Sequence, residues 1–373
     1  MTRNAACIAF IGSAGIPNRY GGFEAFLESC APRLVELGHR VLVTCDAALY
    51  EGDAAEYRGV CRRMVRVRAN GASSVLHDFL AFSSVFREAT HIVVLGVSGG
   101  PWFPLFRAAC AVSGKRLIVN VDGLEWRRTK FGAGKRLALR VFGELAQWAA
   151  HTVVVDNGAL LPFLSAPARR KAFQIAYPGD HVLHSAGLVA PKPGTVLSIC
   201  RIEPENNVAM AIEGFLASGA CRFTVVGNWA HSEYGQALRA RHAGNSRLRL
   251  LDPTYDAGTL CNLRELHAVY IHGHSVGGTN PSLVEMLFYD SELLCFDSSF
   301  NQETAGASAR YFEDAASLTA LLDMPVQPPS EGLAGVRRAQ RARYSRDGIV
   351  AQYLSALGLP ARGSGLTTPP ASE

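Results

Sequence analysis

The stretch HGHSVGGTNPSLVE (residues 272–285) follows a short apolar run, residues 268–271, that predicts a buried strand. Residues 283–288, LVEMLF, predict the start of a helix directly after the glycines. The order along the chain is therefore strand, glycine-rich loop and helix. This order is the repeating unit of α/β folds with a parallel sheet.

The start of a helix after such a loop is suited to anions, because its unpaired N–H groups and the helix dipole point toward a ligand. Glu285 is expected roughly one turn into the helix, where its carboxylate can reach the hydroxyls of a ribose. Together these features predict a nucleoside diphosphate site that includes Gly277, Gly278, Thr279, Asn280, Ser282 and Glu285. The alternative is an ordinary loop with a surface glutamate, because glycine loops alone are weak signals.

The chain has 373 residues, which is enough for two domains. Its net charge of +5 does not by itself indicate a nucleic-acid binder, but it suits anionic substrates or an anionic membrane surface. The nine cysteines are scattered and form no C-x-x-C pair, which is typical of free thiols in a reducing compartment. We find no signal-peptide pattern and no apolar run long enough to cross a bilayer, so we expect a cytoplasmic protein.

A second strand–loop–helix pattern covers residues 6–11, 12–22 and 23–37, and the apolar positions of its helix keep the 3.6-residue period. Asp46 ends the next predicted strand, as in nicotinamide-binding folds. The loop, however, is too long for the G-x-G-x-x-G turn and its glycines are spaced wrongly. The longer loop can reach over a cleft, where Arg19 could contact a phosphate or an acceptor. The alternative for Arg19 is a solvated loop charge.

Buried strands recur along the whole chain. They are predicted at residues 40–45, 60–67, 91–97, 117–121, 152–155, 196–200, 223–226, 248–251, 269–271 and 293–296, and the last of these completes the second sheet. A helix is expected to start at Ser73 or Ser74. Its predicted buried side consists of Val75, Leu76, Phe79, Leu80, Phe82 and Phe86.

Polar residues follow the strand predicted at 117–121, at the end where open α/β sheets bind ligands. The residues concerned are Asp122, Glu125, Trp126 and Arg127. One interpretation is a cluster that contacts the acceptor or a sugar, and the other is an Asp-Gly turn with a capping acid and a surface aromatic. Residues 126–140 are basic and amphipathic, which predicts either a peripheral membrane contact or a solvated helix face.

The α/β alternation restarts after residues 177–195, whose Pro, Gly and His content predicts an interdomain linker. Arg201 follows the first strand of this half, where its guanidinium could clamp a diphosphate. The alternative is a surface arginine paired with Glu203 or Glu205. Asn228 follows the next strand and is predicted to lie in a loop on the base side of a nucleotide.

Four motifs resemble, in the same order, those of bacterial rhamnosyltransferases and related enzymes of glycosyltransferase family 4. They are GSAGIPNRYGGFE (12–24), VDGLEWRR (121–128), RIEPENN (201–207) and the loop at 272–285. FDSSFNQET (296–304) resembles the same subgroup. The resemblance implies the GT-B fold, an α/β architecture of two Rossmann-like, doubly wound parallel-sheet domains facing a cleft.

On this basis we predict four segments. They are an acceptor-side domain at 1–180, a nucleotide-sugar domain at 190–340, a C-terminal helix at 341–359 that could return to the first domain, and a disordered tail at 360–373.

The resemblance implies a retaining, metal-independent hexosyl transfer from a nucleotide sugar to a glycan or lipid-linked oligosaccharide in bacterial surface or exopolysaccharide synthesis. L-Rhamnose from dTDP-rhamnose is the first expectation, and another hexose from a UDP- or GDP-sugar is the alternative. The nucleotide sugar is then a substrate, and no cofactor is expected. The expected partners are this donor, the acceptor and the inner face of the cell membrane, and nucleic acid is not among them.

By the same analogy Glu285 holds the ribose and Arg201 meets the diphosphate, while Gly21 and Gly22 approach the phosphates from the other domain. Asp122, Arg201 and His274 are the catalytic candidates implied by the resemblance. His272 and His274 are interpreted as contacts to the donor sugar or the loop rather than as metal ligands.

Two positions depart from the wider family. Gly277 stands where an acid is usual, and Asn207, counted among the donor contacts, stands where a lysine is usual. Neutralisation of the phosphates would then rest on Arg201, on helix dipoles and on Arg19.

Other classes of protein fit the same architecture. A sugar-nucleotide epimerase would turn over the donor without an acceptor, and a non-catalytic nucleotide-sugar-binding protein would bind it without forming a glycoside. A dinucleotide-dependent reductase is disfavoured by the spacing of the first glycine loop.

Overall fold

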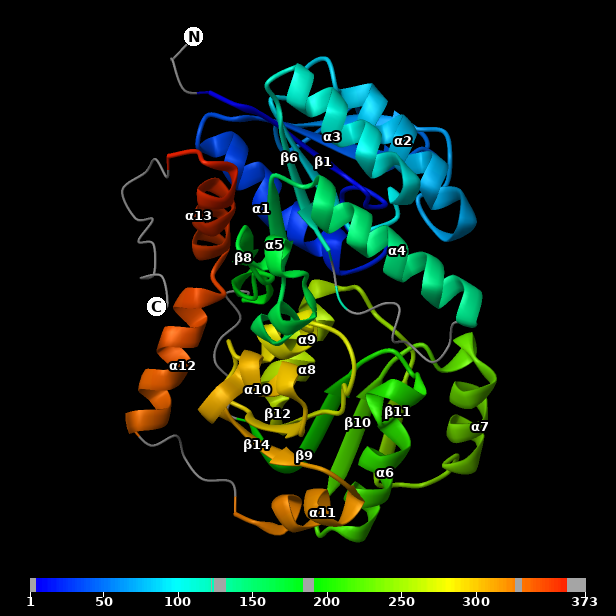
Figure 1. Ribbon diagram of the computed structural model, residues 1–373. Coiled ribbons are helices and arrows are strands. Elements are labelled where there is room, and N and C mark those ends of the chain that lie inside the picture. Colours follow the sequence, from blue (N-terminus) through cyan, green and yellow to red (C-terminus); the bar gives the residue numbers. More distant parts are fainter. Residues whose placement is uncertain (1–4, 122, 124–131, 184–190, 326–330, 361–373) are drawn as a thin grey trace. The chain divides into compact units, whose positions relative to one another are not determined.

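The computed structural model describes residues 5–121, 123, 132–183, 191–325 and 331–360. The chain divides into two compact units, each built on its own parallel sheet. Unit 1 comprises Met1–Pro178 and Arg346–Glu373, and unit 2 comprises Gly179–Ser345. Unit 2 is thus continuous in sequence, whereas unit 1 is completed by a C-terminal helix (Figure 1).

The sheet of unit 1 has eight strands in the order β3-β4-β2-β1-β5-β6-β7-β8. The strands are β1 (Cys7–Ile11), β2 (Arg40–Asp46), β3 (Glu56–Tyr57), β4 (Val60–Val65), β5 (His91–Leu95), β6 (Arg116–Asn120), β7 (Thr152–Val155) and β8 (Ala172–Gln174). The helices are α1 (Gly22–Glu36), α2 (Ser74–Val85), α3 (Phe103–Val112), α4 (Ala133–Ala149), α5 (Ala166–Arg169) and α13 (Arg346–Leu357). Neighbouring strands are parallel, except that β3 pairs with β4 antiparallel.

Helices cover both faces of this sheet, which is why its central strands are runs of Val, Ile and Leu. Right-handed crossovers place α2, α3 and α4 on one face and α1 on the other (Figure 1). The strand order reverses between β1 and β5. The loop of residues 12–21 therefore follows a strand beside this reversal, where sheets of this kind bind ligands.

Helix α13 packs beside α1 and completes the core of unit 1. The buried Tyr353 ring lies 4.9 Å from the Phe26 ring, measured between centroids, and its hydroxyl accepts a hydrogen bond from Asn120 Nδ2 at 3.4 Å. The hydroxyl of Thr152 donates to the carbonyl of Ala356 at 3.2 Å. Strands β6 and β7 are therefore anchored by residues that come much later in the sequence.

The sheet of unit 2 has six parallel strands in the order β11-β10-β9-β12-β13-β14. The strands are β9 (Lys192–Ile199), β10 (Arg222–Val226), β11 (Leu248–Leu251), β12 (His267–His272), β13 (Glu292–Phe296) and β14 (Ala309–Phe312). The helices are α6 (Val208–Ala217), α7 (Glu233–Arg241), α8 (Ala257–Leu266), α9 (Pro281–Met286), α10 (Ser299–Ala305), α11 (Ala315–Asp323) and α12 (Glu331–Arg343).

The core of unit 2 lies under α6 and α11, which pack against each other on one face of the sheet. Trp229 is completely buried there, and its ring N–H donates to the carbonyl of Leu251 at 2.9 Å. The strand order of this sheet reverses between β9 and β12. The segments that follow these two neighbouring strands are the ones that carry the predicted diphosphate and ribose contacts.

Several details differ from the sequence-based expectation, and the short edge strands β3 and β8 of unit 1 were not predicted. The sheet of unit 2 continues past β13 to β14, whose sequence ARYF lacks an apolar run. In α2, Leu76 and Leu80 keep 49% and 37% of their surface exposed, although they were predicted to be buried. His77 and Asp78 are buried instead, with 3.3 Å between His77 Nδ1 and Asp78 Oδ1. The hydrogen bond between His77 and Asp78 gives these two buried polar side chains a partner, and the apolar period of the sequence does not signal it.

Among the described helices, none combines the length and the apolar character that a bilayer span requires.

Candidate functional site

The candidate site of unit 2 is built on the carboxyl ends of β9, β10 and β12, which are neighbours in the sheet. Arg201 follows β9, Asn228 follows β10 and the loop of residues 273–280 follows β12. Parallel strands bring their carboxyl ends to the same edge, so three loops from distant parts of the sequence meet there.

The backbone at Arg201 is held from two sides, while its side chain is half exposed. Asn228 Oδ1 accepts the N–H of Ile202 at 2.7 Å, and Asn206 Nδ2 donates to the carbonyl of Arg201 at 2.6 Å. The guanidinium is 50% exposed and lies 3.8 Å from the Glu203 carboxylate. An ion pair this long and this open to solvent is weak, so the guanidinium remains available to an anion. The amide of Asn228, predicted on the base side of a nucleotide, positions this loop.

The loop after β9 is locked to the loop after β12. Asn207 adopts a left-handed backbone conformation (φ 50°) and donates from Nδ2 to the carbonyl of Gly273 at 2.9 Å. A Cβ on Gly273 would lie 2.2 Å from the carbonyl oxygen of Asn206, so only glycine allows this approach. The N–H of Ser275 donates to the carbonyl of Glu205 at 3.0 Å. Asn207 therefore links the two loops. The glycosyltransferase family that the sequence motifs resemble usually carries a lysine at this position.

His272 and His274 lie at the centre of these loops, and both are buried. His274 Nδ1 is hydrogen-bonded to Asn206 Oδ1, and the carbonyl of His274 accepts a bond from Asn301 Nδ2 at 2.8 Å. His272 Nε2 has no hydrogen-bond partner among the described residues. Burial, reinforced by the neighbouring His274, lowers the pKa of His272 to about 3. The His272 ring is thus neutral at physiological pH and carries no positive charge toward a phosphate.

Among the described residues, no group of three or more His, Cys, Asp or Glu side chains is placed to hold a metal ion.

The neutral His272 predicts a loss of stability in mild acid. Its folded pKa of about 3 lies below the ordinary value of 6.5, so between these values the unfolded chain binds a proton that the folded chain does not. Stability therefore falls as the pH drops through this window, by about 2 kcal/mol of unfolding free energy at about pH 5. Urea denaturation at about pH 7.5 and at about pH 5 measures the change.

The variant His272→Gln cannot titrate, so the same drop in pH should destabilise it about 2 kcal/mol less than the wild type. His231→Gln, at an exposed histidine of the same unit, serves as the matched control and should lose as much as the wild type. Equal acid sensitivity in all three proteins would contradict the prediction.

Glu285 lies in α9 and is an ionised, nearly buried carboxylate. Its side chain is 12% exposed, and it pairs with the buried Arg264 of α8 and with His181 Nε2 at 3.4 Å. Burial alone would raise the pKa of Glu285, but Arg264 and His181 together hold the pKa below its usual value. The Arg264 guanidinium and the His181 ring thus fix the orientation of the carboxylate predicted to grip a ribose.

The glycine loop reaches α9 through a local cap. Asn280 Oδ1 accepts the N–H of Ser282 at 2.9 Å and starts the helix, which spans only Pro281–Met286. Gly277 has a φ of 136°, and a Cβ there would lie 3.0 Å from His274 Nε2. Gly278 and the buried Thr279 complete the loop between Gly277 and Asn280. Because α9 has fewer than two full turns, its dipole is a weak source of positive potential for an anion.

In unit 1, the loop after β1 brings Gly21 and Gly22 to the start of α1. The buried Glu24 fastens this loop, since its Oε1 accepts the N–H of Ala14 at 2.6 Å. Gly12 has a φ of 89°, and a Cβ there would meet the carbonyl oxygen of Leu95 at 2.4 Å. Gly12 therefore allows both the turn of the loop and its close packing against the backbone of Leu95.

Arg19 is already paired within unit 1. Its guanidinium donates to the carbonyl of Leu49 at 2.6 Å, lies 3.1 Å from the Asp53 carboxylate and stacks 4.8 Å above the Tyr50 ring. The side chain is nevertheless 43% exposed. Arg19 is thus paired with Asp53, whereas the sequence predicted either a contact to a phosphate or acceptor or a solvated charge.

Four predicted site residues, Asp122, Glu125, Trp126 and Arg127, lie outside the described residues. The strand that precedes them, β6, is parallel to β1 and β5 and ends at the same edge of the sheet as the strand before the glycine loop.

Two residues of the site were not identified from the sequence. Arg264 lies in a helix and His181 in the stretch predicted as a linker, and only the tertiary structure brings both to Glu285. The one signal in the sequence for Arg264 is a charge among apolar residues on the buried side of α8, which predicts a buried partner of opposite sign.

Comparison with known proteins gives one family match. Residues 6–180 match the model of a family described as a domain of unknown function, DUF1972. No curated protein matches the chain.

Solved structures match both units. HepE (Alr3699) of Anabaena, solved with UDP, has a TM-score of 0.68 at 13% identity, covering 95% of this chain and 99% of that one. A glycosyltransferase of Rickettsia africae has a TM-score of 0.67 at 11% identity, with coverages of 95% and 98%. Sucrose-phosphate synthase of Thermosynechococcus elongatus has a TM-score of 0.69 at 13% identity, with coverages of 94% and 98%. At these identities the likeness concerns the fold.

Proposed function

From the GT-B fold that the chain shares with these structures, we propose that the protein is a glycosyltransferase that uses a nucleotide-sugar donor. The donor would bind to unit 2, with its diphosphate at Arg201 and its ribose at Glu285. The matching structures support this class of ligand, since HepE was solved with UDP and with UDP-glucose.

One observation carries the proposal. At the reversal of the unit 2 sheet, a half-exposed guanidinium without a close carboxylate stands on a loop that is hydrogen-bonded to a glycine-rich loop. In helix α9, which follows that second loop, Glu285 is ionised and held in place. A cation for phosphate and a fixed carboxylate for hydroxyls are the two contacts that a nucleoside diphosphate requires.

The chemistry follows from what these groups supply. When the bond between the sugar and the diphosphate breaks, negative charge grows on the leaving phosphate, and Arg201 would stabilise it by charge-assisted hydrogen bonds. His272 and His274 are buried next to the same loop. We assign His274 to orienting the donor sugar rather than to neutralising the phosphates, because its ring is hydrogen-bonded to Asn206.

We further propose that transfer is retaining and needs no metal ion. Retention, which the resemblance of the motifs implies, would follow from attack of the incoming hydroxyl on the same face of the sugar as the leaving group. A phosphate oxygen of the leaving diphosphate then accepts the proton of that hydroxyl. Holding donor and acceptor in this geometry is the main task of the protein. Asp122 and Arg201 are the remaining catalytic candidates, and Arg19, Glu125, Trp126 and Arg127 are assigned to the acceptor side.

The finer assignment rests on the resemblance of the four sequence motifs to rhamnosyltransferases. It makes L-rhamnose from dTDP-rhamnose the first choice of donor, and a glycan or lipid-linked oligosaccharide of bacterial polysaccharide synthesis the acceptor. The basic stretch 126–140, together with the exposed Leu137 and Val141 of α4, supports a peripheral contact with the cytoplasmic face of the membrane.

Thermal-shift measurements with dTDP-, UDP- and GDP-sugars test the proposal. The correct donor should raise the melting temperature, because a ligand that binds only the folded state stabilises it with the logarithm of its concentration. At about 100 times Kd, the stabilisation would be about 2.7 kcal/mol. Product analysis by mass spectrometry with a lipid-linked acceptor then distinguishes transfer from epimerisation and from binding alone. The absence of a shift with every nucleotide sugar would contradict the proposal.

A further inference from the structure

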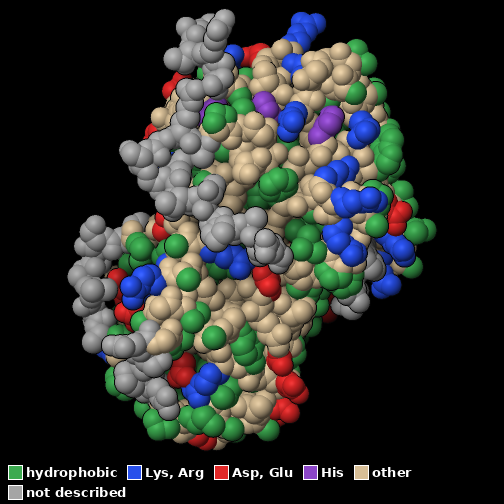
Figure 2. Space-filling view, turned by 60° about the vertical axis from the view of Figure 1, so that its left-hand side comes forward, with side chains coloured by type: hydrophobic (Ala, Val, Ile, Leu, Met, Phe, Trp, Pro, Cys, Tyr) green, Lys and Arg blue, Asp and Glu red, His purple; other side chains and the backbone are tan. Residues whose placement is uncertain are grey.

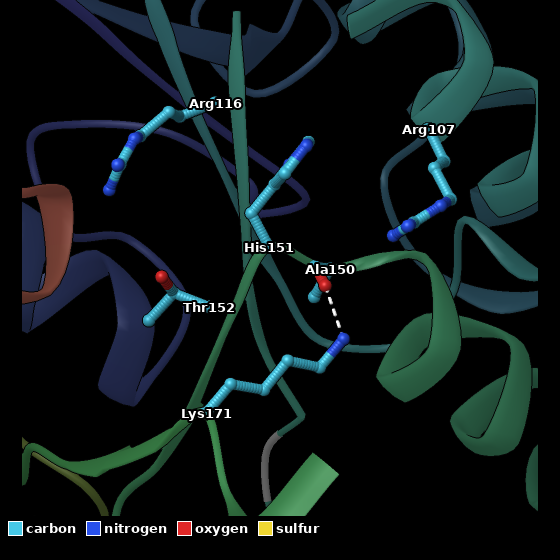
Figure 3. Close-up of a pocket in the computed structure, with 6 residues that line it drawn as sticks. All are labelled: Arg107, Arg116, Ala150, His151, Thr152 and Lys171. Atoms are coloured by element: carbon cyan, nitrogen blue, oxygen red, sulfur yellow. Dashed lines mark hydrogen bonds between the residues drawn. The ribbon is translucent and has the colours of Figure 1, made fainter. Parts of the chain in front are cut away.

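Unit 1 contains a pocket at the edge of its sheet opposite to the glycine loop. The pocket is lined by Arg107, Arg116, Ala150, His151, Thr152 and Lys171, and its volume is about 390 Å³ (Figure 3). Arg116 and Thr152 are the first residues of β6 and β7, and Lys171 directly precedes β8. The amino ends of three neighbouring strands thus form its floor, whereas the glycine loop follows the carboxyl end of β1.

The lining is strongly basic. Three of the six residues are permanent cations, a fourth is histidine, and none of the six carries a carboxylate. Elsewhere in unit 1 several arginines have acidic partners within 3.1 Å, as Arg33 has Asp347 and Arg62 has Asp53. Lys, Arg and His side chains also gather on one face of unit 1 in the space-filling view (Figure 2). The pocket therefore concentrates positive potential that the described residues leave unneutralised.

Arg107 and Lys171 each donate hydrogen bonds to backbone carbonyls and keep further N–H donors for a ligand. Arg107 donates from Nη1 to the carbonyls of Trp148 and Ala149, at 3.2 and 3.1 Å, and Lys171 Nζ donates to the carbonyl of Ala150. These bonds cap the carboxyl end of α4, where cations are favourable. In Figure 3 the two side chains converge beside Ala150 from opposite sides. Arg107 Nε and Nη2 have no hydrogen-bond partner among the described residues.

Arg116 does not share this capping task. Its backbone N–H donates to the carbonyl of Thr90 at 3.0 Å, but its exposed side chain makes no hydrogen bond or ion pair with the described residues. Its guanidinium packs over Gly358, where a Cβ would lie 2.9 Å from Nη1. Capping of α4 thus explains Arg107 and Lys171, but it does not explain why a third cation lines the same pocket.

His151 adds a donor of fixed direction. Its Nδ1 accepts the N–H of Leu117 at 3.0 Å, so the neutral ring carries its proton on Nε2. Burial and the nearby Arg107 lower the pKa of His151, and the same two causes lower the pKa of Lys171. Burial is the larger cause of both shifts, and the contribution of Arg107 expresses repulsion between basic groups that a bound anion would relieve.

We propose that this pocket binds a phosphate group, at a site separate from the one proposed for the nucleotide sugar. Arg107 and Arg116 offer planar guanidinium donors, Lys171 a point charge and His151 a neutral N–H, which together match the oxygens of a phosphate. The volume accommodates the phosphate and part of the molecule that carries it.

The surroundings of the pocket are compatible with two sources of the phosphate group. It belongs either to a small soluble molecule or to the headgroup of an anionic lipid. Trp148 stands beside the pocket with 58% of its surface exposed, and Arg107 lies 5.1 Å from its ring centroid. An exposed tryptophan next to basic groups is typical of membrane interfaces, so the experiment includes an arm for each source.

The test uses the whole chain and the variant Arg116→Gln, which removes one charge without breaking a side-chain hydrogen bond or ion pair among the described residues. Inorganic phosphate is titrated by isothermal calorimetry at constant ionic strength, and sedimentation measures binding to phosphatidylcholine vesicles with and without phosphatidylglycerol. We expect Arg116→Gln to weaken binding about tenfold in at least one arm. Arg66→Gln, at an exposed arginine just after β4 on the opposite edge of the sheet, is the charge-matched control and should bind like the wild type.

Arg116-dependent binding of inorganic phosphate supports the soluble source, and Arg116-dependent binding of phosphatidylglycerol vesicles alone supports the lipid headgroup. The proposal is overturned if neither ligand binds, or if Arg66→Gln weakens binding as much as Arg116→Gln. Unchanged melting temperatures of both variants show that the comparison concerns folded protein. None of these outcomes depends on sugar transfer, so they stand apart from the proposed function.

Discussion

Replacing Arg201 by alanine is expected to reduce the rate of sugar transfer about 100- to 1,000-fold, the effect of removing one donor that stabilises charge in a transition state. The reason is that the guanidinium would face the leaving diphosphate, where no other described cation of the loops after β9 and β12 is placed. Folding should survive, because the side chain is half exposed and its one charged neighbour, Glu203, lies 3.8 Å away. Steady-state kinetics with the donor identified by thermal shift measures the loss.

Two comparisons sharpen this prediction. Arg201→Lys keeps the charge but loses the planar, two-pronged donor, so it should recover only part of the rate. Arg222→Ala removes an exposed arginine at the amino end of β10 and should leave the rate unchanged. Full activity of Arg201→Ala would remove the diphosphate clamp from the mechanism.

Breaking the ion pair of Glu285 and Arg264 is expected to have the largest effect on stability. Arg264→Met leaves the Glu285 carboxylate nearly buried with His181 as its remaining partner. Removing one member of a buried pair typically costs about 3–5 kcal/mol of unfolding free energy. Urea denaturation at neutral pH measures this cost.

The double variant Arg264→Met/Glu285→Met separates stability from donor binding. It removes both charges, so it should be more stable than Arg264→Met alone. It should nevertheless bind the donor at least about tenfold more weakly than the wild type, because no carboxylate remains for the ribose hydroxyls. Calorimetric titration with the nucleotide sugar is the readout, and wild-type affinity in the double variant would contradict the role of Glu285.

The fold could be predicted largely from the sequence, and the predicted GT-B class is confirmed. Parallel strands covered on both faces are continuous apolar runs, and β6 with its sequence RLIVN is readily found. Strand β14 has no such run, because it lies at the edge of its sheet, and it was missed. The helix α2 was found but its buried side was partly wrong, since the buried pair of His77 and Asp78 breaks the apolar pattern.

For the candidate site, the sequence predicts which loops meet but not which side chains contact each other. Strand ends and glycines mark the loops that carry Arg201 and Gly277, because parallel topology decides which loops meet. The partners of each side chain depend on tertiary packing, so Arg264 and His181 at Glu285, and Asp53 at Arg19, had no local signal. The role of Asn207 as a link between two loops likewise follows only from its left-handed backbone and its bond to Gly273.

The place of α13 also constrains the order of events during synthesis on the ribosome. A nascent chain that has released all of Met1–Pro178 still lacks the helix that covers Phe26 and anchors β6 and β7. Unit 2, which is continuous, requires no residue beyond Ser345 for its own packing. Although domains commonly mature from the N-terminus onward, here the N-terminal half must wait in an incomplete state, and chaperones have their longest opportunity to engage it.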